Sequence, residues 1–81
     1  MQDLLATVQG AFKAAFDVDP ELITMETKPT DIPAWDSMGH LALVSSLEQA
    51  FRLSFDVDQV MEMEDVRQIV RIVQGCLAKE S

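Results

Sequence analysis

The sequence predicts an all-α fold, a four-helix bundle with three longer helices, a short third helix and a long first loop. Two observations support this fold class. Apolar residues recur at spacings of three and four in several segments, which is the period of a helix with one buried face. Prolines and aspartates, which end or cap helices, separate these segments. The length of 81 residues fits one domain, residues 1–81, and is too short for two.

The first helix is expected close to the N-terminus. Its apolar residues lie at helical spacing: Leu4, Leu5, Val8, Ala11, Phe12, Ala15 and Phe16. Asp3 is the expected N-cap, because an aspartate side chain accepts hydrogen bonds from first-turn amides. Asp17, Asp19 and Pro20 should end or follow this helix, since proline disfavours a helical residue before it.

A long loop should connect residues 17 to 35. All three prolines of the chain lie there and no apolar period is sustained, so we expect an ordered loop with one short turn. Ile32 and Trp35 are the side chains expected to anchor it in the core. A loop this long in so small a domain usually has a function or wraps the core.

The second helix should begin at Asp36 or Ser37 and run to about Arg52. One face carries the expected core residues His40, Leu43, Val44, Leu47 and Phe51. The opposite side carries Met38, Leu41, Ala42, Ser45 and Gln49. Met38 and Leu41 are therefore sizeable apolar side chains without an evident core role.

A break is expected over residues 52–58, with Phe55 and Val57 turned inward. Asp58 is the expected cap of a short helix that passes through Met61. Met63 follows this helix. The two methionines are interpreted as core filling, with one of them lining an apolar ligand pocket as the alternative.

The last helix should begin at Asp65, where Gln68 three residues later completes a capping box. Its apolar stripe consists of Val66, Ile69, Val70, Val73, Cys76 and Leu77. Cys76 is the only cysteine, so the chain can form no internal disulfide and no thiolate metal cluster. We expect Cys76 to be a small core residue, and its solitary state suits a reducing compartment.

The charge is strongly acidic, with 14 acids and 6 bases giving a formal net charge of −8. Nucleic-acid binding is not expected, because contacts to phosphates need clustered lysines and arginines. Residues 36–65 hold seven of the acids and one base, which should steer this region toward basic patches on partner proteins. No signal peptide and no membrane span are recognisable, so the prediction is a cytoplasmic protein, monomeric by default.

The most informative segment for chemistry is residues 33–51. Ser37 follows Asp36 at the first turn of the second helix, directly after a proline-containing loop. Amides at a helix N-terminus favour a negatively charged group, so a phosphate ester on this hydroxyl would be stabilised. Asp36 can cap the helix or help to hold magnesium during phosphate transfer. No resident metal site is predicted, because the two Asp-Val-Asp stretches lack the glycine and glutamate of a calcium loop.

The segment Trp35-Asp36-Ser37-Met38-Gly39-His40-Leu41, followed by Leu47-Glu48 and Phe51, resembles the prosthetic-group site of the acyl carrier protein family. That family carries Asp-Ser-Leu or a close variant at the start of its second helix. The resemblance extends over nearly the whole chain, since the helix lengths, the long first loop, the short third helix and the acidity also fit.

The resemblance implies that Ser37 receives 4′-phosphopantetheine from coenzyme A through a separate magnesium-dependent phosphopantetheinyl transferase. The thiol of this arm would hold an acyl group as a thioester. The chain would then be a non-catalytic carrier, loaded by an acyl- or aminoacyl-transferring enzyme. It would deliver intermediates to synthases or transferases of fatty acid, polyketide or related biosynthesis that have basic docking patches.

The same resemblance assigns supporting roles to four residues. Asp36 matches the aspartate that precedes the modified serine. Glu48 matches an acid of the second helix that meets basic patches on partners. Met38 and Leu41 match apolar positions beside the arm that partners cover.

Several alternatives remain open at this stage. Asp-Ser-Met-Gly also resembles D-alanyl carrier proteins, so an aminoacyl or peptidyl cargo is the first alternative. An unmodified helical interaction module is a second, and a small hydrolase using Ser37 and His40 is a third, which is weak because no orienting acid is evident. His40 is expected at the edge of the core face. Gly39 either opens space beside the arm or is tolerated near a helix end.

Overall fold

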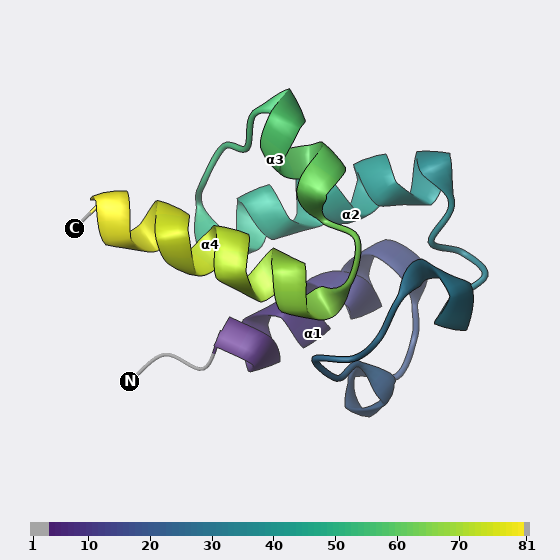
Figure 1. Cartoon of the computed structure of the whole chain (residues 1–81). Coiled ribbons are helices and arrows are strands. Elements are labelled where there is room, and N and C mark those ends of the chain that lie inside the picture. The colour runs from purple at the N-terminus through teal and green to yellow at the C-terminus, as the bar shows by residue number, and fades with distance from the viewer. Residues whose placement is uncertain (1–3, 81) are drawn as a thin grey trace.

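A computed structural model describes residues 4–80, with side chains through residue 78. The described chain forms α1 (Leu4–Phe16), α2 (Ser37–Phe51), α3 (Val57–Glu62) and α4 (Val66–Glu80), and no strand occurs within it (Figure 1). This confirms the predicted all-α class, with three longer helices and a short third one. The predicted N-cap Asp3 lies outside the described residues. None of the helices in the described range is long and apolar enough to cross a membrane.

The helices pack around one apolar core. α1 lies against both α2 and α4, while α3 packs against α4 (Figure 1). The fully buried large side chains come from α1, the loop, α2 and α4: Phe12, Val8, Ile23, Leu43, Leu47, Val66, Ile69 and Val73. Ile32 and Trp35 are buried as predicted, and the Trp35 ring meets Phe12 edge to face at a centroid distance of 5.1 Å. The loop is therefore part of the core as well as a connection.

The long loop contains two 3₁₀ turns, η1 (Pro20–Leu22) and η2 (Pro29–Asp31), where one short turn was predicted. Each begins with a proline, whose fixed φ suits the first position of a helical turn. The loop also caps α4, because the carbonyls of Thr27 and Met25 accept hydrogen bonds from Val66 N and Arg67 N at 3.0 and 3.1 Å. These bonds satisfy amides that the helix itself cannot.

The start of α3 differs from the prediction. Asp56, and not Asp58, is the N-cap, so Val57 is the first helical residue and is 73% exposed instead of turned inward. Asp56 is the cap because Gln59, three residues later, can return its hydrogen bond. Gln59 N donates to Asp56 Oδ1 at 2.8 Å and Asp56 N donates to Gln59 Oε1 at 3.0 Å. A cap at Asp58 would have placed Met61 at that position, which has no group able to close the box. Phe55 packs partly against the core as predicted.

The remaining helix boundaries agree with the sequence. Asp65 Oδ1 accepts from Gln68 N at 2.8 Å, which confirms the cap of α4. α2 ends at Phe51, followed by Arg52 in the left-handed conformation with φ 55°. Met63 is buried in the core, whereas Met61 is exposed, so core filling holds for one of the two methionines.

Candidate functional site

Ser37 is the first residue of α2 and its side chain is exposed. Asp36 is the N-cap, and its Oδ1 accepts a hydrogen bond from Gly39 N at 2.8 Å. His40 N donates to the Asp36 carbonyl at 2.7 Å and begins the helical ladder. This arrangement places the Ser37 hydroxyl at the positive end of a helix dipole, on a rigid element and open to solvent.

The loop before Ser37 is held close to α2 at Gly39. A Cβ atom built on Gly39 would overlap the carbonyl oxygen of Ala34 and would lie 3.0 Å from Cε1 of Phe16. The absence of a side chain therefore lets the loop backbone contact the helix directly. Gly39 opens no space beside Ser37, because the Ala34 backbone fills the space at the glycine, and it is required by packing rather than merely tolerated.

His40 joins the loop, α2 and α3. Trp35 Nε1–H donates to His40 Nδ1 at 2.8 Å, and His40 Nε2 lies 2.9 Å from the carbonyl oxygen of Val60. An indole nitrogen can only donate and a carbonyl can only accept, so the imidazole is neutral with its proton on Nε2. Both ring nitrogens are thus engaged away from Ser37, which argues against a hydrolase in which His40 activates the serine.

A groove of about 440 Å³ lies beside Ser37. Its lining comes from four separate segments: Pro29, Trp35, Asp36, Ser37, His40 and Met63. The sequence analysis did not find this groove. Pro29 and Met63 lie in different loops, and no periodicity signal relates residues so distant in the chain.

Exposed apolar side chains lie on the two helices nearest this site. Met38 and Leu41 on α2 are 81% and 65% exposed, as the sequence predicted, and Val57 and Met61 on α3 are similarly open. The sequence analysis missed Val57 and Met61. Their spacing of four residues on a short helix would have been the available signal.

Glu48 is half-buried on α2, and its Oε2 accepts a hydrogen bond from Phe55 N at 2.9 Å. This carboxylate therefore holds the connection between α2 and α3. Its contact with basic patches on partners stays a prediction from the family resemblance.

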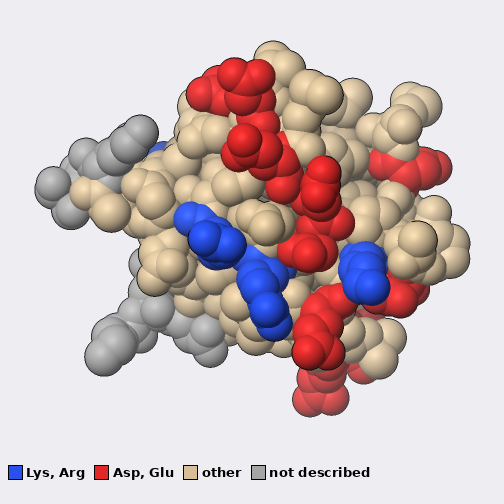
Figure 2. All heavy atoms as spheres, in the orientation of Figure 1, with Lys and Arg blue, Asp and Glu red and all other residues tan. Residues whose placement is uncertain are grey.

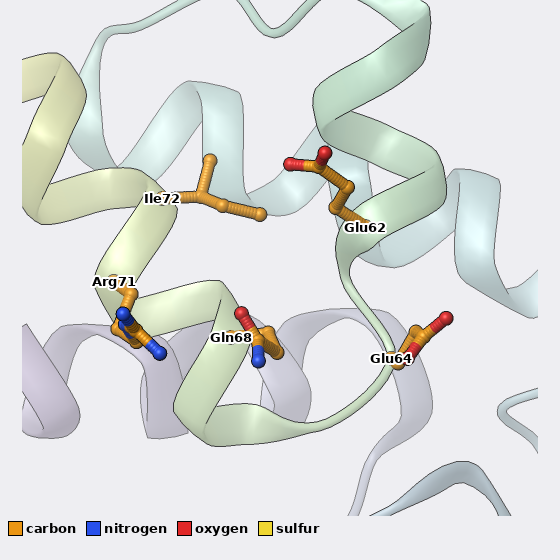
Figure 3. A pocket seen from close by; sticks show the side chains of 5 residues that line it. All are labelled: Glu62, Glu64, Gln68, Arg71 and Ile72. Carbon is orange, nitrogen blue, oxygen red and sulfur yellow. The ribbon is translucent and has the colours of Figure 1, made fainter.

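Charges are unevenly distributed on the face seen in Figure 2, where acidic side chains form a band with basic side chains beside it. A second hollow, about 420 Å³ in volume, opens between α3 and α4. Figure 3 shows Glu62 extending from α3 toward Ile72 on α4, with Arg71 and Glu64 on opposite sides. No three His, Cys, Asp or Glu side chains in the described part of the chain are grouped to hold a metal ion.

No family model matches the sequence, and no curated protein matches it. Among solved structures, the fold matches the solution NMR structure of a holo acyl carrier protein from Geobacter metallireducens, with a TM-score of 0.85 and 30% sequence identity. The match covers 98% of this chain and 91% of that chain. The chain belongs to the acyl carrier protein family. Membership of the acyl carrier proteins supports a carrier role for this chain.

Proposed function

We propose that this chain carries acyl groups as thioesters on a 4′-phosphopantetheine arm attached to Ser37. The observation that carries the proposal is the exposed Ser37 hydroxyl at the first position of α2, in a chain with an acyl carrier protein fold. The arm supplies a terminal thiol, which the described residues around Ser37 lack. The protein supplies the attachment point and the surfaces that partner enzymes bind.

The residues at the start of α2 fit a phosphate ester. The amides of Ser37 and Met38 stand in the first turn, where the helix offers them no acceptor, so they can donate to phosphate oxygens. In the transfer step, Ser37 Oγ attacks the phosphorus that bears pantetheine in coenzyme A. A new O–P ester forms, the pyrophosphate bond breaks, adenosine bisphosphate leaves, and a base of the transferase takes the hydroxyl proton. Asp36, the N-cap directly before Ser37, would supply a carboxylate to the magnesium ion of this step.

Loading of Ser37 is the first prediction. The protein is incubated with coenzyme A, magnesium and a broad-specificity phosphopantetheinyl transferase, and its intact mass is measured. We expect a gain of one phosphopantetheine, which Ser37→Ala abolishes without loss of helical circular dichroism. Ser45→Ala, which changes another exposed serine of α2, is the matched control and should load normally.

Two results would count against this proposal. A Ser37→Ala protein that still gains the arm would refute the attachment point. A folded wild-type protein that gains nothing, even with the transferase of its own source organism, would favour the unmodified interaction module.

An aminoacyl cargo is the second candidate, because the stretch Asp36-Ser37-Met38-Gly39 also resembles D-alanyl carrier proteins. The two cargoes differ in the enzyme that loads the thiol. Loading by an amino-acid-adenylating enzyme would favour the aminoacyl carrier, and loading by an acyl-transferring or fatty-acid-activating enzyme would favour the acyl carrier.

A second prediction concerns partner binding through Leu41, which is 65% exposed one helical turn from Ser37. Leu41→Ser should raise the KM of the transferase about 5–10-fold, because an interface would bury an apolar side chain there. The melting temperature should be unchanged, since Leu41 contributes little to the core. Leu22→Ser on η1, at 70% exposure, is the matched control and should leave KM unaltered. Equal effects of the two substitutions would exclude a specific contact at Leu41.

A further inference from the structure

We propose that the groove beside Ser37 binds the pantoyl part of the arm, with its two geminal methyl groups lying against Pro29, Trp35 and Met63. This inference rests on the proposed attachment at Ser37 and adds a binding site for the arm itself. It distinguishes an arm that is held along the protein surface from one that extends freely into solvent.

The groove is positioned to receive the arm, because Ser37 is one of its lining residues. Met63 and Trp35 form its floor; they are 2% and 4% exposed and belong to the packed core. Pro29 stands at the first position of η2 and forms one wall. The groove is therefore lined by side chains that the core already holds, so binding does not require the core to rearrange.

The chemistry of the arm matches this floor. Beyond the phosphate, the arm continues with one methylene and then a carbon that carries two methyl groups. These are the apolar atoms nearest to Ser37, and removing them from water against Pro29, Trp35 and Met63 is favourable. Since the arm is covalently attached, its local concentration at the groove is high, and a modest contact is enough to hold it.

The hydrogen bonds of His40 argue that the arm stays outside the bundle. His40 Nε2 lies 2.9 Å from the Val60 carbonyl, so the imidazole bridges α2 and α3 at the level of the groove. Beneath it, Leu43 and Leu47 are completely buried and fill the core. An arm that passed between α2 and α3 beside His40 would have to break this bridge, whereas contact with the outer groove leaves it intact.

The test uses the full-length protein loaded with ¹³C-labelled pantetheine and studied by NMR. We expect isotope-filtered NOEs from the geminal methyls of the arm to the Met63 methyl and the Trp35 indole ring. The resonances of both residues should shift between the apo and holo forms. Met61, which is exposed on α3 and does not line the groove, should show neither effect.

A pair of proline variants tests the wall of the groove. Pro29→Ala should weaken the NOEs from the arm to Met63, whereas Pro20→Ala, at the equivalent first position of η1, should leave them intact. A protein that gains the arm by mass but gives no NOE to Met63 or Trp35 would overturn the groove and leave the carrier function standing. A protein that gains no arm would overturn both.

Discussion

Gly39→Ala is expected to destabilise the protein by about 2 kcal/mol, which corresponds to a fall in melting temperature of roughly 8–16 °C. The added methyl group would occupy the position of the Ala34 carbonyl oxygen and press on Phe16. Because the first of these atoms belongs to the backbone, no side-chain rotation relieves the overlap, and the loop before Ser37 has to move. Urea unfolding followed by circular dichroism and by fluorescence of the single tryptophan measures the change.

The two other glycines are matched controls. Gly10 in α1 and Gly75 in α4 are exposed helical positions where a Cβ atom would meet nothing within 4 Å. Alanine at either position should stabilise the protein by about 0.5–1 kcal/mol, because glycine is the poorer helix former. If Gly39→Ala also stabilised the protein, the close approach of Ala34 to α2 would be refuted.

Periodicity was sufficient to predict the longer helices. α1 and α2 end within a residue of their expected limits, because aspartate, proline and the apolar repeat all indicate the same boundaries. The exposure of Met38 and Leu41 could be predicted for a similar reason, since a helix with a filled core face must turn its remaining apolar residues to solvent.

Local ambiguity explains the error at α3. Asp56 and Asp58 are both acceptable N-caps, and choosing between them requires knowing which residue at the third helical position can return a hydrogen bond. Gln59 can do so and Met61 cannot, and this choice reverses the environment of Val57. The sequence therefore contained the information that decides the cap, namely the polar side chain of Gln59. A hydrophobic pattern takes no account of that side chain.

Contacts between distant segments explain what the sequence could not provide at the site. A helical wheel places His40 on the core face, but it does not reveal that Trp35 and Val60 are its partners. It likewise cannot show that the Glu48 carboxylate binds Phe55 N within the protein. The motif predicts Ser37 as the attachment residue, whereas the groove beside it depends on the tertiary fold and could not be predicted.

His40→Leu is expected to have the larger effect, a loss of about 3 kcal/mol and of roughly 12–24 °C in melting temperature. Within the described residues, no buried side-chain nitrogen or oxygen lacks a hydrogen-bond partner. Leucine would fill most of the volume of the imidazole but would leave the buried Trp35 Nε1–H without an acceptor. The Val60 carbonyl would still have a hydrogen-bond donor, because it also accepts from Met63 N at 3.3 Å.

Two amide variants separate the bonds of His40. Asparagine places an oxygen near the position of Nδ1 and can still accept from Trp35, whereas the amide of glutamine reaches toward Val60 and cannot easily do both. We therefore expect His40→Asn to retain more stability than His40→Gln, since the Trp35 donor has no other acceptor. The single indole N–H resonance should stay near its wild-type shift in His40→Asn and move in His40→Gln and His40→Leu.

A double-mutant cycle isolates the bond between Trp35 and His40. In a Trp35→Phe background, His40→Leu should lower the free energy of unfolding far less, because no buried donor is left unpaired. An undiminished loss would show that the bond from Trp35 to His40 does not stabilise the fold.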